Sequence, residues 1–148
     1  MPATPVTVIR HRKERIAKCS LRHLHERPGF RFLRASCGMR FDASGQILLA
    51  VDAPPLSSAD RGRALVLLDS TWRHLAELRR CITGEPILRS IPGDVRTVYP
   101  RKSRIYDDPE AGLASVEALY VALRILGEDD ESLLDGYHWK DQFLASLR

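Results

Sequence analysis

The clearest candidates for chemistry are residues 69–72, which read Asp-Ser-Thr-Trp. They follow the apolar run 64–68, which lacks the alternation of a half-exposed strand and so predicts a parallel-sheet strand covered on both faces. From Ser70 onwards the apolar spacing becomes helical. The segment therefore places a carboxylate, two hydroxyls and an indole between the carboxyl end of a strand and the amino end of a helix. Ligands bind at such positions in open α/β sheets.

The elements that must position these groups alternate along the chain. We expect strands over 5–10, 30–35, 46–52, 64–68, 87–91 and 95–99, and helices over 70–82, 112–127 and 131–147. Residues 56–62 predict one helical turn, capped by Ser57 or Ser58 with Asp60 in its first turn. The pattern predicts an α/β fold, a mostly parallel sheet with flanking helices. A chain of 148 residues is one domain by size.

Basic charge is concentrated near the N-terminus. The formal net charge is +4, but residues 10–34 alone hold nine Lys or Arg against two Glu. Such a segment is typical of proteins that contact a phosphate backbone, although a solvated basic face without a partner has the same pattern. Charge favours RNA as the partner. The expected RNA-binding residues are Arg12, Lys13, Arg15, Lys18, Arg22, Arg101, Lys102 and Arg104.

The sequence argues against a membrane-spanning, a secreted or a disulfide-bonded protein. No apolar run of about 18 residues exists, so we expect no membrane span. The N-terminus lacks the apolar region of a secretory signal. Three widely spaced cysteines indicate free thiols in a reducing cytoplasm. We therefore expect a cytoplasmic protein, and the oligomeric state stays open.

Neither a metal site nor a catalytic triad is expected. The spacing of Cys19, His23, His25 and Cys37 is not that of a zinc site. The other histidines have no carboxylate, Ser or Cys partner at a telling spacing: His11, His74 and His138. The glycines are scattered and form no phosphate-binding loop.

The Asp-Ser-Thr-Trp segment resembles the signature of the DTW-domain proteins, RNA aminocarboxypropyltransferases that use S-adenosylmethionine (SAM). Its surroundings are closer to the sister family that modifies small-subunit ribosomal RNA, where Leu-Ser-Pro-x-Asp-Arg precedes Asp-Cys-Ser-Trp. Here residues 56–61 read Leu-Ser-Ser-Ala-Asp-Arg. Residues 113–119 are similar to the Leu-Ser-x-[Leu/Val]-Glu-Ala of both families, and residues 18–24 to an early Lys-Cys-Thr-Gly-Lys-x-Leu. The resemblance runs from about residue 16 to residue 143, and residues 25–55 carry little of it.

The resemblance implies both a fold and a reaction. The fold is SPOUT-like, with a SAM-binding core over residues 56–148 that includes a C-terminal trefoil knot, and with residues 1–55 as a basic, strand-rich part. The periodicity fits a doubly wound sheet equally well. The implied reaction moves the aminocarboxypropyl group of SAM to a uridine or pseudouridine nitrogen in tRNA or rRNA, without a metal. It would serve RNA processing or ribosome biogenesis and leave methylthioadenosine.

The resemblance also implies the site. The SAM-binding residues would be Ser20, Leu68, Asp69, Trp72, Ser115 and Glu117. Ser20 would lie at the aminocarboxypropyl group of SAM. The next residue, Leu21, stands where the family has glycine, so a backbone conformation that needs glycine is excluded there.

Residue chemistry leaves several of these roles open. Trp72 can shield the SAM methyl and stabilise the sulfonium by cation–π attraction, or it can be a core aromatic of an amphipathic helix. Asp69, the candidate catalytic residue, can cap the helix, contact SAM or accept the uracil imide proton. We favour binding, since a helix amino end stabilises the carboxylate as the anion. Ser115 and Glu117 can stabilise a helix start, and Glu117 can instead pair with the SAM ammonium or face the RNA.

Two other functions compete with aminocarboxypropyl transfer. One is a SPOUT-type RNA methyltransferase, which would leave S-adenosylhomocysteine instead of methylthioadenosine. The other is a non-catalytic RNA-binding module of ribosome assembly with a decayed pocket. Such a module would gain no stability from SAM, because only a ligand bound by the folded state stabilises it.

Overall fold

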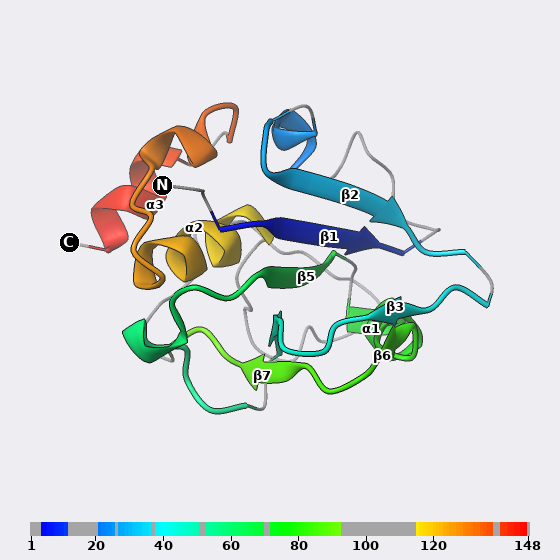
Figure 1. The fold of residues 1–148 in the computed structure, drawn as a ribbon. Coiled ribbons are helices and arrows are strands. Elements are labelled where there is room, and N and C mark those ends of the chain that lie inside the picture. Colours follow the sequence, from blue (N-terminus) through cyan, green and yellow to red (C-terminus); the bar gives the residue numbers. More distant parts are fainter. Residues whose placement is uncertain are drawn as a thin grey trace.

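The computed structural model of this chain describes residues 4–11, 21–25, 27–36, 38–50, 53–69, 72–92, 115–137 and 140–147. The main sheet has five strands in the order β2-β1-β5-β4-β7, and Figure 1 shows β2, β1, β5 and β7 following one another across it. Its strands are β1 (Val6–Arg10), β2 (Phe30–Arg34), β4 (Ile47–Leu49), β5 (Leu65–Asp69) and β7 (Ile87–Arg89). All neighbours are parallel. The predicted α/β class with a parallel sheet is confirmed, while the expected strand 95–99 lies outside the described residues.

The central strands are buried on both sides, as the unbroken apolar run in β5 predicts. One core contains Val8 and Leu67 and packs against α2 (Ser115–Ile125) and α3 (Lys140–Ser146). The other contains Ile9 and Val66 and packs against α1 (Trp72–Arg79). Successive residues of a strand point to opposite faces, so each strand divides its side chains between the two cores.

Two predicted helices are present as α1 and α2, although α1 ends at Arg79 whereas the prediction ran to Ile82, and the prediction fails at the C-terminus. The expected single helix over 131–147 is wrong: a 3₁₀ turn, η4 (Glu131–Leu134), is separated from α3. Gly136 lies between them with a φ of 90°, a left-handed value that ends helices and favours glycine. The turn predicted before the central strand is present as η3 (Ser58–Asp60), with Ser57 as its cap and Asp60 bonded back to the Ser57 amide.

Several smaller features complete the described chain. Another 3₁₀ turn, η2 (Arg22–Leu24), precedes β2. A second sheet pairs β3 (Phe41–Asp42) with β6 (Ile82–Thr83), strands too short for periodicity to reveal. None of the helices in the described ranges has the length and apolar character that a membrane span requires. The predicted knot would depend on the path of residues 93–114, which lie outside the described residues.

Tyr120 links α2 to the acidic segment that follows it, and its hydroxyl donates a hydrogen bond of 2.8 Å to Asp129. Burial, aided by this bond, raises the pKa of Tyr120 to about 12. An unfolded tyrosine has a pKa of about 10, so the contribution to stability is complete below about pH 10 and is lost as the pH rises towards 12. Tyr120→Phe should lower the free energy of unfolding by about 1 kcal/mol at neutral pH and flatten this alkaline decline.

Urea unfolding over a series of pH values tests this expectation. Tyr137→Phe is the matched control, because it removes a different phenol hydroxyl, the one bonded to Glu117. The control should keep the alkaline decline. An unchanged decline in Tyr120→Phe would show that another group causes it.

Candidate functional site

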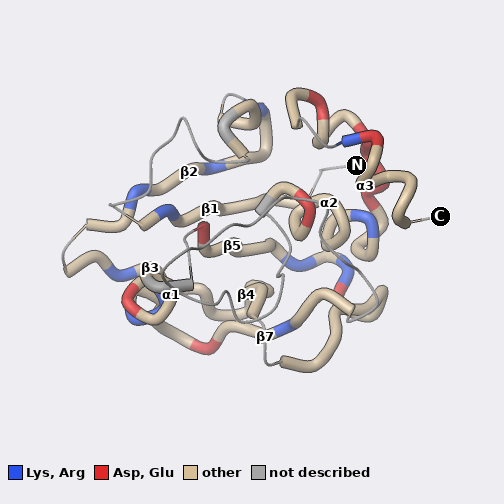
Figure 2. Tube along the Cα trace, turned by 180° about the vertical axis from the view of Figure 1, so that it is seen from behind, with Lys and Arg blue, Asp and Glu red and all other residues tan. Residues whose placement is uncertain are grey.

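The candidate site begins where β1 and β5 end. The register pairs Arg10, the last residue of β1, with Asp69, the last residue of β5. Because β1 and β5 are parallel neighbours, which Figure 2 shows side by side, both residues lie at the same edge of the sheet. Their side chains point towards the face that carries Val8 and Leu67. A carboxylate and a guanidinium thus meet at the edge where α/β sheets bind ligands.

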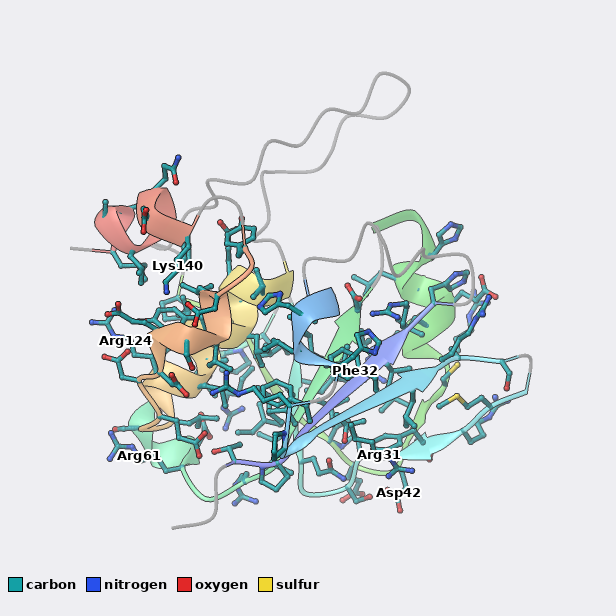
Figure 3. The ribbon with its side chains drawn as sticks, turned by 90° about the horizontal axis from the view of Figure 1, so that it is seen from above. Arg31, Phe32, Asp42, Arg61, Arg124 and Lys140 are labelled. Carbon is teal, nitrogen blue, oxygen red and sulfur yellow. The ribbon has the colours of Figure 1, made fainter. Side chains whose placement is uncertain are left out.

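Arg10 holds three groups of this edge together. Its Nε lies 3.4 Å from Asp69 Oδ2, and its Nη2 lies 3.0 Å from Nε2 of His25. The guanidinium carbon lies 5.9 Å from the ring centre of Phe32, on β2 (Figure 3), close enough for cation–π attraction. Arg10 and Asp69 are both buried. The carboxylate is therefore held in one orientation by a partner that is itself fixed.

His25 is the neutral member of this group. Its ring stacks on Phe32 with centroids 4.0 Å apart. Burial, together with the positive charge of Arg10, lowers the pKa of His25, and Asp69 opposes the shift. A guanidinium can only donate, so His25 Nε2 accepts the hydrogen bond from Arg10. The imidazole consequently keeps its proton on Nδ1 and adds no charge at neutral pH.

Leu68 and Asp69, both expected at the SAM site, point to opposite faces. Leu68 packs with the second core, which contains Ile9 and Val66, whereas Asp69 is paired with Arg10. Asp69 is the last residue of β5 and not a residue of α1. The structure therefore brings Asp69, but not the Leu68 side chain, to the face with the Arg10 group.

The other expected SAM-site residues are placed in part. Trp72 is the first residue of α1 and Ser115 the first of α2, while their side chains and all of Ser20 lie outside the described residues. Glu117 is fully buried, and its Oε2 accepts a hydrogen bond of 3.0 Å from the Tyr137 hydroxyl. Glu117 is therefore bonded within the protein, to a residue that follows η4.

Leu21 is accommodated where the resembling family has glycine. Its φ is −98°, which any residue adopts. Its side chain is fully buried in the core beneath α2. The substitution therefore fills a core position and imposes no strain.

The side chains of the expected RNA-binding residues are outside the described residues, so only basic residues near them in the sequence can be placed. For Arg22 only the side chain lies outside the described residues. The others lie outside them entirely: Arg12, Lys13, Arg15, Lys18, Arg101, Lys102 and Arg104. Of the remaining basic segment, Arg27 is used internally, in an ion pair with Asp130. Arg31 and Arg34 are exposed on the edge strand β2.

Sequence reasoning gave Arg10, His25 and Phe32 no role in this site. A signal for Arg10 was present, since Arg10 ends the predicted strand 5–10 and Asp69 directly follows the predicted strand 64–68. The carboxyl ends of neighbouring parallel strands meet, so the pair would follow once β1 and β5 are known to be neighbours. His25 and Phe32 carry no comparable signal, because their contact depends on how η2 folds back over β2.

Comparison with known proteins finds a solved structure with a similar fold. The sequence matches no protein-family model and no curated protein. The structure is similar to that of the SAM-dependent rRNA:acp-transferase Tsr3 from Vulcanisaeta distributa, with a TM-score of 0.71 and 24% sequence identity. The match covers 95% of this chain and 77% of that one. The two chains share a fold across almost the whole of the present sequence.

Proposed function

We propose that this protein is a SAM-dependent RNA aminocarboxypropyltransferase that modifies a uridine or pseudouridine in tRNA or rRNA. One observation carries the proposal: Asp69 of the Asp-Ser-Thr-Trp segment, oriented by Arg10, lies at the carboxyl edge of a sheet whose fold is similar to that of an rRNA:acp-transferase. The residues at this edge suit SAM. A buried carboxylate can accept hydrogen bonds from an ammonium or from ribose hydroxyls.

The chemistry of SAM makes geometry decisive. Its sulfonium activates three attached carbons, and the one that reacts is the one held in line with the acceptor and the leaving sulfur. In the proposed enzyme, Trp72 covers the methyl and stabilises the sulfonium by cation–π attraction. Ser20, Ser115 and the backbone at Leu68 complete the pocket, and Glu117 holds the start of α2 through Tyr137. The aminocarboxypropyl chain is then the group left facing the RNA.

Asp69 is proposed to bind and orient SAM. Proton uptake by its carboxylate would give up the buried ion pair with Arg10. The imide nitrogen of uracil is acidic enough to lose its proton to a modest base or to solvent. The transfer therefore needs positioning more than it needs a strong base.

The RNA partner is proposed to lie along the basic segment and the edge strand. Arg31 and Arg34 of β2 extend the predicted contacts Arg12, Lys13 and Arg15 along the same part of the chain. Phosphate contacts of this kind release counterions, so affinity should fall steeply with salt concentration.

The test is to incubate the protein with total bacterial RNA and SAM labelled either in the carboxyl carbon or in the methyl. Carboxyl label in the RNA without methyl label supports the proposal, and size fractionation then separates tRNA from rRNA acceptors. Methyl label alone would replace it with a methyltransferase. Transfer of neither label, to RNA from any growth stage or to precursor ribosomal particles, would leave an RNA-binding module.

A further inference from the structure

A second polar cluster lies on the face of the sheet opposite Asp69. It consists of His11, which directly follows β1, and of His74 and Glu77 on α1. His11 Nε2 lies 2.9 Å from Glu77 Oε2, and the rings of His11 and His74 stack with centroids 4.2 Å apart. The possible ligand atoms of all three residues lie within 4.8 Å of one another. We propose that this His11–His74–Glu77 cluster binds a divalent transition metal ion, with Zn²⁺ as the expected occupant.

The chemistry of the three ligands determines which ion we expect to bind. Two imidazoles and one carboxylate form a ligand set used for zinc, and imidazole nitrogen favours first-row transition metals over Mg²⁺ or Ca²⁺. Zinc bonds of about 2.0–2.2 Å in a tetrahedral arrangement separate neighbouring ligand atoms by roughly 3.3 Å. The 2.9 Å between His11 and Glu77 is close to this separation. Small side-chain movements would therefore make room for the ion.

The three ligands differ in freedom. His11 is 1% exposed and is fixed at the end of β1, where its amide donates to the Asp69 carbonyl. His74 and Glu77 are three residues apart on α1 and so share a helix face. Both are half-buried, and the Glu77 side chain is 43% exposed. One ligand is therefore preset and two can adjust.

The His74 ring must change its orientation before both histidines can bind the same ion. The stacked rings are 12° from parallel, so their nitrogen lone pairs lie in two nearly parallel planes and do not converge on one point between the rings. His74 must turn about its terminal side-chain torsion, whose energy profile is broad, to aim a nitrogen at the ion. The exposed side of Glu77 leaves space for a water as fourth ligand.

A metal here would join the end of β1 to α1. These elements flank the proposed SAM site, since Asp69 precedes α1 and Trp72 begins it. The ion would brace the junction from the opposite face and take no part in the transfer. This proposal departs from the sequence-based expectation of no metal site, because the fold joins histidines that the sequence spacing does not.

The experiment uses the full chain without a histidine tag, stripped of metal by a chelator. Co²⁺ is added and followed by its visible absorption, and Zn²⁺ affinity is measured by competition with a chelating dye. We expect one equivalent to bind, with Zn²⁺ raising the melting temperature in a concentration-dependent way. His74→Gln and Glu77→Gln should each weaken binding at least about tenfold.

Matched substitutions outside the cluster serve as controls. His23→Gln changes a histidine that is bonded to the Leu133 carbonyl, and Glu85→Gln changes an exposed glutamate before β7. Both should keep the affinity of the unchanged protein. Absence of a saturable Co²⁺ spectrum, or equal affinity in all four variants, would overturn the proposal. A loss confined to His23→Gln would overturn it too, by moving the ion to the N-terminal histidines. Neither SAM nor RNA is present, so the result is independent of the proposed transfer activity.

Discussion

Replacing Arg10 with leucine should lower the free energy of unfolding by about 3 kcal/mol, because it leaves the buried carboxylate of Asp69 without its charged partner. The change also removes the hydrogen bond to His25 and the contact with Phe32. Urea unfolding at neutral pH measures the loss. A loss below about 1 kcal/mol would mean that solvent replaces Arg10, and that the pair does not fix the carboxylate.

A double variant separates the stability of this pair from its function. Arg10→Met with Asp69→Leu removes both charges and puts apolar groups in their place. Such replacements of buried pairs are often neutral or stabilising, so most of the stability should return. Aminocarboxypropyl transfer and SAM binding should be lost in the double variant, because it lacks the Asp69 carboxylate. Recovery of SAM binding along with stability would rule out the binding role proposed for Asp69.

Replacing Trp72 with alanine should weaken SAM binding about a hundredfold while the fold persists. Trp72→Ala removes about 2 kcal/mol of cation–π attraction and also the aromatic contact area. Each loss of about 1.4 kcal/mol in binding free energy weakens the affinity tenfold. Calorimetric titration with SAM measures the effect. The loss should be smaller for methylthioadenosine, which has no positive charge on its sulfur.

Trp72→Phe is the control for this prediction. It keeps an aromatic face and should retain most of the SAM affinity. If Trp72→Ala instead lowers stability strongly and leaves the affinity per folded molecule unchanged, Trp72 is a core residue. The alternative that the amphipathic spacing of α1 leaves open would then be correct.

The sequence predicted the central elements well because their signals are local. The apolar run before Asp69 indicated a strand covered on both faces, and β5 has that environment. By contrast, the contact of Arg10 with Asp69 and that of His11 with Glu77 depend on β1 lying beside β5. Strand order is a tertiary property that periodicity does not encode. The single helix predicted over 131–147 is wrong for a different reason. Apolar residues that are buried in the structure lie on both sides of Gly136, at Leu133 and Phe143, so the apolar pattern continues past the glycine that interrupts the helix.

The position of β1 has a consequence for the order in which the chain can fold. β1 pairs with β2, which follows soon after it, and also with β5, which ends at Asp69. During synthesis, at about 5–20 residues per second, the second edge of β1 stays unpaired until β5 has emerged from the ribosome. Separating residues 1–55 from the remainder would put β1, β2 and β4 in one fragment and β5 and β7 in the other, although β5 lies between β1 and β4 in the sheet. The halves should therefore refold together or not at all, and β1 is exposed to mispairing until β5 arrives.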